Sequence, residues 1–163
     1  MITIIAAIGA NNELAKDDKM LWSLPDDYAR FKNITRNHPV IMGRKSVETL
    51  PDLLADRTAF VVTRDENYSR DQTRVVHSIE EPVEKACTMD EQVFIIGGGQ
   101  IYHVGLRFAH RLELTRVQAK FSQANVFFPV FSTNEWELVA SLVHEKDDNH
   151  AFRFVYETWN RKA

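Results

Sequence analysis

The chain has 163 residues, 44% hydrophobic and 26% charged, which favours a single soluble domain spanning residues 1–163. Its 20 Lys and Arg against 23 Asp and Glu give a net charge of −3, whereas a general nucleic-acid binder normally has a clearly basic surface. The single cysteine excludes an internal disulfide, and the six histidines show no HxxxH spacing, so we expect no metal site.

The longest apolar stretch, residues 1–8, is far shorter than the roughly 18 residues of a membrane span. It also lacks the basic segment that precedes the apolar part of a secretory signal. These features exclude a membrane anchor or export signal at this position. We therefore expect a cytoplasmic protein without membrane association.

Four short apolar runs lack alternation, which is typical of strands buried on both faces of a parallel sheet. They cover residues 2–8, 39–42, 59–63 and 93–96. Helix signals lie between them, including a Ser-Leu-Pro-Asp start at 23–26 and a Ser-Ile-Glu-Glu capping box at 78–81. Segment 9–23 has little periodicity and is predicted to be a surface loop, whose apolar end either anchors in the core or serves as a ligand lid.

The C-terminal part of the chain has a different pattern, because apolar and polar residues alternate over 136–142 and 152–157 around a polar loop. This pattern predicts an antiparallel hairpin at the edge of the sheet. The fold class is therefore α/β: one domain with a mostly parallel central sheet, flanked by helices, and an antiparallel C-terminal edge hairpin.

A carboxylate interrupts the first predicted helix. Positions 24, 28, 31 and 34 form an apolar stripe, and Asp27 falls on it. Burying an ionised group without a partner costs several kcal/mol, so Asp27 lies either at the stripe's edge in water or in a pocket facing a cationic or hydrogen-bonding ligand. Its neighbour Asp26 is off the stripe and is typical of a first-turn carboxylate favoured by the helix dipole.

Two glycine junctions follow predicted strands. Gly97-Gly98-Gly99 precedes a segment with helical spacing, and Gly43-Arg44-Lys45-Ser46 follows the strand at 39–42. Such junctions can present backbone N–H groups to a phosphate, although a tight turn explains each equally well. In a parallel sheet both junctions lie at the carboxyl edge of the strands, where ligands of such sheets bind.

These residues recur in the order and spacing of a known family. They are Ile4-Ile5-Ala6-Ala7, residues 20–27 (Met-Leu-Trp-Ser-Leu-Pro-Asp-Asp), Phe31-Lys32, residues 39–46 with Glu48-Thr49-Leu50, and residues 95–102 (Ile-Ile-Gly-Gly-Gly-Gln-Ile-Tyr). Over residues 1–129 and, more loosely, through the hairpin, the sequence resembles dihydrofolate reductase in its bacterial chromosomal form.

The resemblance implies reduction of 7,8-dihydrofolate to tetrahydrofolate with NADPH, in support of one-carbon metabolism. It also implies a monomer whose ligands are the substrate, the cofactor and antifolate inhibitors. Asp27 would bind the pterin and raise the basicity of N5, which takes a proton from water. Thr115 would hydrogen-bond Asp27, Trp22 would reach it through water, Tyr102 would stabilise charge during hydride transfer, and Met20 would complete the catalytic set.

The resemblance also assigns binding residues. The substrate set is Ile5, Ala6, Asp27, Tyr28, Phe31, Leu50, Leu54, Arg57, Ile96 and Thr115, with Arg57 as a bidentate clamp for the glutamate carboxylate. The cofactor set is Ala7, Leu14, Ala15, Gly43, Arg44, Lys45, Ser46, Thr63, Arg64, His77, Ile96, Gly97, Gly98, Gly99, Gln100, Ile101 and Tyr102. Among these, Arg44, Thr63 and Arg64 would receive the 2′-phosphate, and the Gly97-Gly98 bond would be cis. For His77, a plain surface position is an equal alternative.

The sequence departs from the family pattern at several positions. Leu14-Ala15 replaces an Ile-Gly pair, Leu21 replaces Pro, Ala124-Asn125-Val126 replaces Gly-Asp-Thr, Tyr28 replaces Leu or Phe, and 51–56 differs from a Pro-rich loop. We expect altered loop kinetics with retained activity. Two functions are alternatives to dihydrofolate reduction: that of a related NADPH reductase acting on a ribosylated pyrimidine, and that of a nucleotide-binding module without catalysis.

Cys87 is predicted to be a small core residue.

Overall fold

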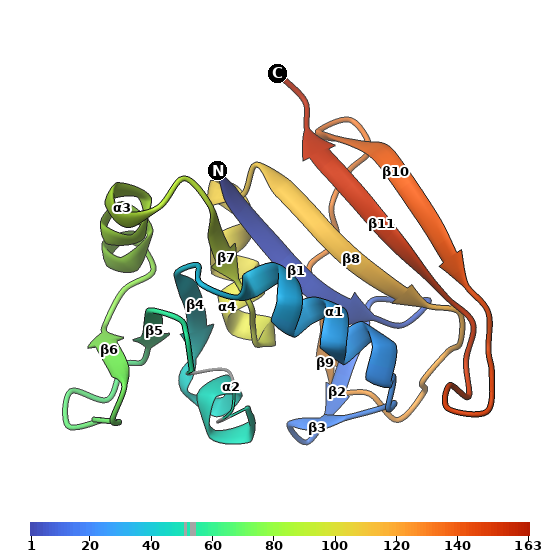
Figure 1. Ribbon diagram of the computed structural model, residues 1–163, viewed down its shortest axis with the longest axis horizontal. Coiled ribbons are helices and arrows are strands. Elements are labelled where there is room, and N and C mark those ends of the chain that lie inside the picture. The colour runs from blue at the N-terminus through green and yellow to red at the C-terminus, as the bar shows by residue number, and fades with distance from the viewer. Residues whose placement is uncertain (51, 53–54) are drawn as a thin grey trace.

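The computed structural model describes residues 1–50, 52 and 55–163 and shows an eight-stranded sheet in the order β10-β11-β8-β1-β7-β4-β5-β6 (Figure 1). Its strands are β1 (Ile2–Ile8), β4 (Val40–Gly43), β5 (Ala59–Val62), β6 (Thr73–Val76), β7 (Val93–Ile95), β8 (Arg111–Val117), β10 (Trp136–His144) and β11 (Phe154–Arg161). The helices are α1 (Pro25–Thr35), α2 (Arg44–Thr49), α3 (Glu80–Met89) and α4 (Gly99–Gly105), with a 3-10 turn, η2, at Leu106–Phe108.

From β6 to β8 in the sheet order, neighbouring strands pair in parallel. β11 pairs antiparallel with both β8 and β10. The predicted α/β fold is confirmed, and so are its four buried parallel strands and the C-terminal edge hairpin. Strands β6 and β8 lay outside the prediction. β10 is the edge strand of the sheet, so most of its residues are exposed; Trp136, at its start, is buried.

The parallel strands bury side chains on both faces. Ile4, Ile41 and Phe60 belong to one core that also contains Val83 of α3 and Ile101 of α4. The intervening positions point to the other face, where Ile5, Val40, Met42 and Val61 pack with Val47 of α2 and with partly buried residues of α1. This two-sided burial explains the lack of alternation in the sequence of these strands.

Segment 9–23 is more ordered than predicted. It contains β2 (Glu13–Lys16) and β3 (Lys19–Met20), which form a second sheet with β9 (Val126–Phe127) in the order β3-β2-β9. The side chain of Glu13 holds segment 9–23 in place. It is only 2% exposed, and its carboxylate accepts hydrogen bonds from the backbone N–H groups of Asn11 and Phe121. The prediction of a plain surface loop was therefore wrong, because periodicity does not register polar anchoring.

Three local predictions also need correction. The N-cap of α1 is Leu24 and not Ser23, and the N–H of Asp26 donates to Nε2 of His150 at 3.1 Å. At α3 the N-cap is Ile79, although Ser78 Oγ accepts the N–H of Glu81 at a long 3.4 Å. Cys87 is exposed on α3 and not in the core, because the buried face of this short helix consists of Pro82, Val83 and Ala86.

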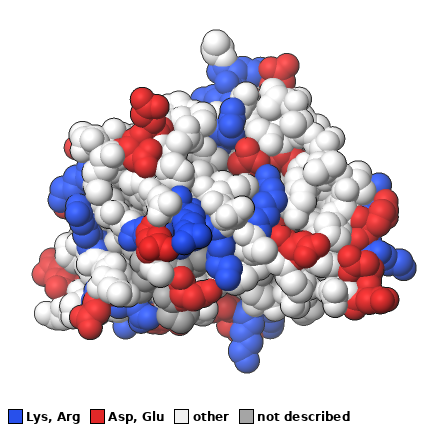
Figure 2. Space-filling view, in the orientation of Figure 1, with Lys and Arg blue, Asp and Glu red and all other residues white. Residues whose placement is uncertain are grey.

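Acidic and basic side chains are interspersed over the face of the molecule shown in Figure 2. Within the described residues, every helix is too short or too polar to cross a membrane.

Candidate active site

The two glycine junctions meet at the carboxyl edge of the sheet. The N–H of Gly43 donates to the carbonyl of Gly97 at 2.7 Å, and the N–H of Ile96 donates to the carbonyl of Ile41 at 2.9 Å. The Gly97-Gly98 peptide bond is cis, as the family resemblance implied, and Gly97 has a φ of 115°. Glycine is needed there because this φ is strained for an L side chain and because a Cβ would lie 3.0 Å from the Tyr102 hydroxyl.

The junctions leave an open cradle that suits a dinucleotide. A Cβ placed on Gly98 would meet only Ser46 Oγ, at 3.5 Å, so the space in front of this backbone is free for a ligand. On the other side, a Cβ on Gly99 would come within 2.6 Å of Val126 Cγ1 and 3.8 Å of Leu14. The small sheet therefore closes one wall of the cradle, and the residues present fit the pyrophosphate of a dinucleotide.

Asp27 is partly buried on α1, on the side of the helix that faces β8. Thr115 Oγ1, on β8, donates to Asp27 Oδ1 at 2.6 Å, and Thr115 is only 3% exposed. Burial raises the pKa of Asp27 above its usual range, and this effect is opposed by the Thr115 hydrogen bond and by the positive charge of Arg30. Of the two possibilities that the sequence left open, this partial burial and the Thr115 contact favour the pocket position, which stays a prediction.

Trp22 covers this region from the end of the small sheet. It is 8% exposed and packs on Phe121 with ring centroids 5.1 Å apart. Its indole Nε1 is buried without a hydrogen-bond partner among the described residues. A buried donor of this kind needs an acceptor, which a water or a ligand bound beside Asp27 would supply. By contrast, Met20 is 66% exposed.

Tyr102 joins the cradle to the first strand. Its hydroxyl donates to the carbonyl of Ile5 at 2.8 Å, and the side chain is 6% exposed. Burial, with a smaller contribution from the charge of Asp27, raises the pKa of this phenol, so it stays a neutral donor. Ile5, Ala6 and Ile96 are buried around it at the ends of β1 and β7.

The apolar stripe of α1 is only partly buried. Phe31 and Leu50 pack against the second core while retaining exposure, which fits side chains that line a ligand cleft. The hydroxyl of Tyr28 donates to both carboxylate oxygens of Asp52 at 2.9 Å, and burial together with this contact raises the pKa of Tyr28 to about 12. The predicted wall residue Leu54 lies outside the described residues.

Arg57 is held by the backbone of two neighbouring segments. Its guanidinium donates to the carbonyls of Lys32 (2.6 Å) and Ala55 (2.7 Å), and its Nε donates to Thr35 Oγ1 at 3.2 Å. Burial lowers the pKa of Arg57 slightly from a very high value, so the charge is retained. These contacts fix the direction of the side chain at the end of α1.

The cations expected at the cofactor already have acidic partners. Arg44 bonds Glu48 and Asp65, each at 3.1 Å, and stacks on Tyr68. Lys45 Nζ pairs with Asp18 Oδ2 at 3.1 Å, which ties α2 to the β2–β3 turn.

The other residues predicted to bind the cofactor differ in exposure. His77 lies beside Thr63, because its Nδ1 is 2.8 Å from the Thr63 carbonyl. Arg64 and Gln100 are exposed, as is His77, whereas Ile101 is buried and Ala7, Ala15 and Ser46 are partly buried. Sequence reasoning missed Asp18, Asp65 and Tyr68, whose partners lie 20 or more positions away along the chain, so that no local pattern marks them.

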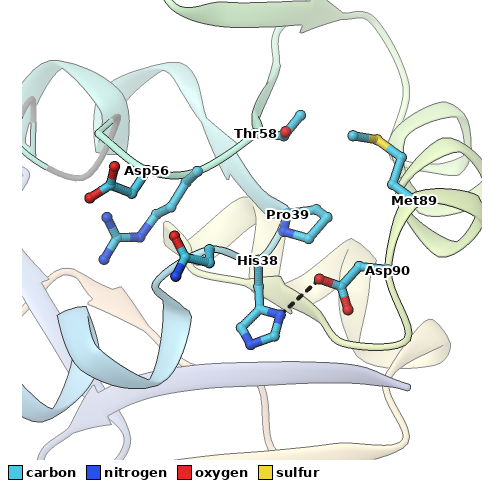
Figure 3. A pocket seen from close by; sticks show the side chains of 8 residues that line it. His38, Pro39, Asp56, Thr58, Met89 and Asp90 are labelled. Atoms are coloured by element: carbon cyan, nitrogen blue, oxygen red, sulfur yellow. Dashed lines mark hydrogen bonds and ion pairs between the residues drawn. The ribbon is translucent and has the colours of Figure 1, made fainter.

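A separate hollow opens at the other edge of the sheet (Figure 3). It has a volume of about 470 Å³ and is lined by Asn37, His38, Pro39, Asp56, Arg57, Thr58, Met89 and Asp90. His38 and Asp90 are joined across it at 2.9 Å. Because it lies before the starts of β4, β5 and β7, it is at the amino ends of these strands. The catalytic candidates gather at the carboxyl ends, where we place the site.

Comparison with known proteins agrees with this assignment. Residues 1–161 match the family model described as dihydrofolate reductase. The chain is 34% identical to dihydrofolate reductase of Bacillus subtilis (strain 168), over 99% of this chain and 95% of the relative. It is 31% identical to that of Staphylococcus haemolyticus, over 98% and 95%.

The chain also shares its fold with a solved structure. Dihydrofolate reductase from Enterococcus faecalis, complexed with NADP(H) and RAB-propyl, superposes with a TM-score of 0.88 at 27% identity, covering 100% of this chain and 97% of that chain. The family match, the near-complete coverage and the shared fold lead to one conclusion: the chain belongs to the dihydrofolate reductase family.

Proposed function

We propose that this chain catalyses the NADPH-dependent reduction of 7,8-dihydrofolate to 5,6,7,8-tetrahydrofolate, with Asp27 as the residue that binds and polarises the pterin. The observation that carries the proposal is the Asp27–Thr115 pair, a partly buried carboxylate held by a hydrogen bond at the edge of the sheet where the two glycine junctions meet. NADPH, when bound, supplies the hydride that reaches C6 of the substrate. The family match and the NADP(H) complex of the E. faecalis relative support this cofactor.

On the substrate side, Asp27 would accept hydrogen bonds from N3 and the 2-amino group of the pterin. Its oxygen Oδ1 is held by Thr115 at 2.6 Å, which fixes the carboxylate plane before substrate arrives. Its negative charge favours the protonated form of the ring, so that N5 takes its proton from water more readily. Trp22, whose buried Nε1 needs an acceptor, would hold a water beside this carboxylate.

The carbonyls of Ile5 and Ile96 would face the pterin edge, and the half-buried Phe31 and Leu50 would cover the aminobenzoyl ring, with Leu54 and Tyr28 beside them. Arg57, directed by the Lys32 and Ala55 carbonyls, would clamp the glutamate carboxylate. Antifolate inhibitors would occupy the same cleft. Met20 would act as an exposed part of the lid.

On the cofactor side, Ser46 and the backbone of residues 43–46 and 97–101 would bind the pyrophosphate, and Arg44, Thr63 and Arg64 would bind the 2′-phosphate. Arg44 would exchange Asp65 for the phosphate, a change between two oxygen anions at the same guanidinium. Tyr102 would lie at the nicotinamide, whose carboxamide Ala7 would meet through its carbonyl. Leu14, Ala15, Lys45, His77 and Gln100 would complete the contacts.

The experiment compares wild type with Asp27→Asn by the loss of NADPH absorbance in the presence of dihydrofolate. We expect the variant to lose about 10²-fold or more in turnover, because the neutral amide cannot supply the charge. Its NADPH affinity, measured by fluorescence, should be unchanged. The matched control is Glu84→Gln, an exposed carboxylate on α3, with unchanged turnover.

Wild type that binds NADPH and leaves it unconsumed with dihydrofolate would contradict the proposed reaction. Normal turnover in Asp27→Asn would refute the role of this carboxylate. The proposal also includes a monomer that works in the cytoplasm without nucleic-acid partners. The monomer is supported by the fact that one chain supplies the residues of the candidate site. Sedimentation tests the oligomeric state, and cell fractionation tests the location.

A further inference from the structure

Four metal-binding side chains gather where the start of α1 meets the β10–β11 hairpin. Asp26 is in the first turn of α1, His144 ends β10, and Asp147 and His150 lie in the connection to β11. One ligand atom from each lies within 4.8 Å of all the others. The reduction proposed above uses none of these four residues.

Hydrogen bonds orient both imidazoles toward a common point. Nδ1 of His150 lies 2.8 Å from Asp147 Oδ1, and Nδ1 of His144 lies 2.7 Å from the Glu145 carbonyl. Because both partner oxygens face these Nδ1 atoms as acceptors, each Nδ1 carries a proton. Nε2 of His150 accepts the N–H of Asp26 at 3.1 Å and lies 3.8 Å from Asp26 Oδ2. Nε2 of His144 donates to Asp26 Oδ2 at 2.9 Å, and a bound metal ion would replace this proton.

This arrangement is the one that metal-binding histidines adopt. A ligating imidazole usually donates its other N–H to a carboxylate or a backbone carbonyl, which fixes the ring and raises the basicity of the ligating nitrogen. Asp147 and the Glu145 carbonyl take these outer positions here. Two histidines whose Nε2 atoms face one carboxylate form a donor set suited to Zn²⁺, Co²⁺ or Ni²⁺ once the proton on His144 Nε2 is displaced.

The donors combine rigidity with an adjustable member. His150 is 2% exposed, and the ring of His144 stacks on Phe154 with centroids 4.3 Å apart and an interplanar angle of 15°. The side chain of Asp26 is 61% exposed, so it can turn aside and admit a cation between the two rings. The N–H of Asp26, which now donates to His150 Nε2 at 3.1 Å, would then donate to water.

We propose that Asp26, His144 and His150 form a binding site for a divalent transition-metal ion, positioned by Asp147 and linking α1 to the β10–β11 hairpin. The site is independent of the proposed reductase activity. Its donors come from segments more than 100 residues apart, which is why histidine spacing along the chain gave no indication of it.

Titration of the untagged, full-length protein with Co²⁺, followed by visible absorption, tests the proposal, and Zn²⁺ competition completes it. We expect one equivalent of Co²⁺ to bind with ligand-field bands that Zn²⁺ abolishes. At 100 times its Kd, Zn²⁺ should raise the Tm by about 5–10 °C. His144→Gln should abolish the bands, and Asp147→Asn should weaken binding about 10- to 100-fold.

His103→Gln is the matched control, because His103 is an exposed histidine on α4 outside the cluster. It should bind Co²⁺ like wild type. Because replacing the buried His150 can disturb folding, His144→Gln and Asp26→Asn carry the test, with far-UV circular dichroism as the check on fold. Equal binding by His144→Gln and wild type, or the absence of ligand-field bands from wild type at millimolar Co²⁺, would overturn the proposal.

Discussion

Glu13 offers a sharp test of how polar burial shapes the small sheet. The side chain is 2% exposed, and each carboxylate oxygen accepts one backbone N–H, Oε1 from Asn11 at 2.5 Å and Oε2 from Phe121 at 2.6 Å. Hydrogen bonds to charged groups stabilise by about 1.5–3 kcal/mol each. Gln keeps one carbonyl acceptor and turns its NH₂ group toward the other N–H, so Glu13→Gln should lower the free energy of unfolding by about 2 kcal/mol.

Glu13→Ala removes both acceptors and should cost about 3–5 kcal/mol. For a domain of this size, 1 kcal/mol corresponds to about 2–4 °C, so Glu13→Gln should lower the Tm by about 4–8 °C and Glu13→Ala by more. Circular dichroism melts and urea unfolding with unchanged m-values provide the measurement. A Glu13→Gln protein that melts within about 1 °C of wild type would refute this explanation of why segment 9–23 is ordered.

Three further outcomes are expected. Thr35→Val keeps the volume but removes the Oγ1 that donates to a helix carbonyl and accepts an arginine Nε, so urea unfolding should show a loss of about 1–2 kcal/mol. Gly97→Ala should cost about 1–3 kcal/mol by the same assay, because of its φ of 115° and the Tyr102 hydroxyl 3.0 Å from the new Cβ. The N–H of Gln92, with His38, lowers the pKa of Asp90, so this carboxylate stabilises the fold above its unfolded pKa and loses that effect as pH falls through the folded value. Asp90→Asn should therefore flatten the acid side of the stability–pH curve, and an unchanged slope would contradict this.

The parallel core was predictable because burial on both faces leaves a strong signal. Strands β1, β4, β5 and β7 contain nearly continuous apolar residues, the pattern of strands covered on both faces. Strand β8 was missed although it alternates. Its apolar position Leu112 is buried, whereas Glu113, on the opposite face, pairs with Arg30. Arg116, which breaks the alternation on the face of Leu112, pairs with Glu157. Those charged residues made the segment resemble a surface segment.

The candidate site was predictable to the extent that its residues break local rules. Asp27 interrupts an apolar stripe, and Gly97 follows a buried strand, so each carries a signal of its own. The partners that complete the site carry no such signal, because Asp18 and Asp65 are ordinary exposed carboxylates until the fold brings them to Lys45 and Arg44. Ion pairs between residues far apart in the sequence leave no local pattern, so they can be recognised only in the three-dimensional structure.

The order of segment 9–23 comes from polar contacts to three distant parts of the chain. Glu13 anchors one end, and Asp18 pairs with Lys45 of α2 at the β2–β3 turn. Asn125 stands where the family has an aspartate, yet it accepts the N–H of Asp17 at 3.0 Å and donates to its carboxylate at 2.8 Å. Asn125 lacks the charge of that aspartate, and its amide makes two hydrogen bonds to Asp17 instead.

These contacts also join the segment to the cofactor cradle. Leu14 approaches the position of a Cβ on Gly99 at 3.8 Å, Val126 of the same small sheet approaches it at 2.6 Å, and Lys45 belongs to the helix that begins at the other glycine junction. A phosphate that drew Lys45 away from Asp18 would release one of the three anchors, whereas Glu13 and Asn125 would still hold theirs. In the proposed complex, a phosphate bound by Lys45 would therefore remove one ion pair from the β2–β3 turn, while the hydrogen bonds between Asp17 and Asn125 would still hold this turn to the small sheet.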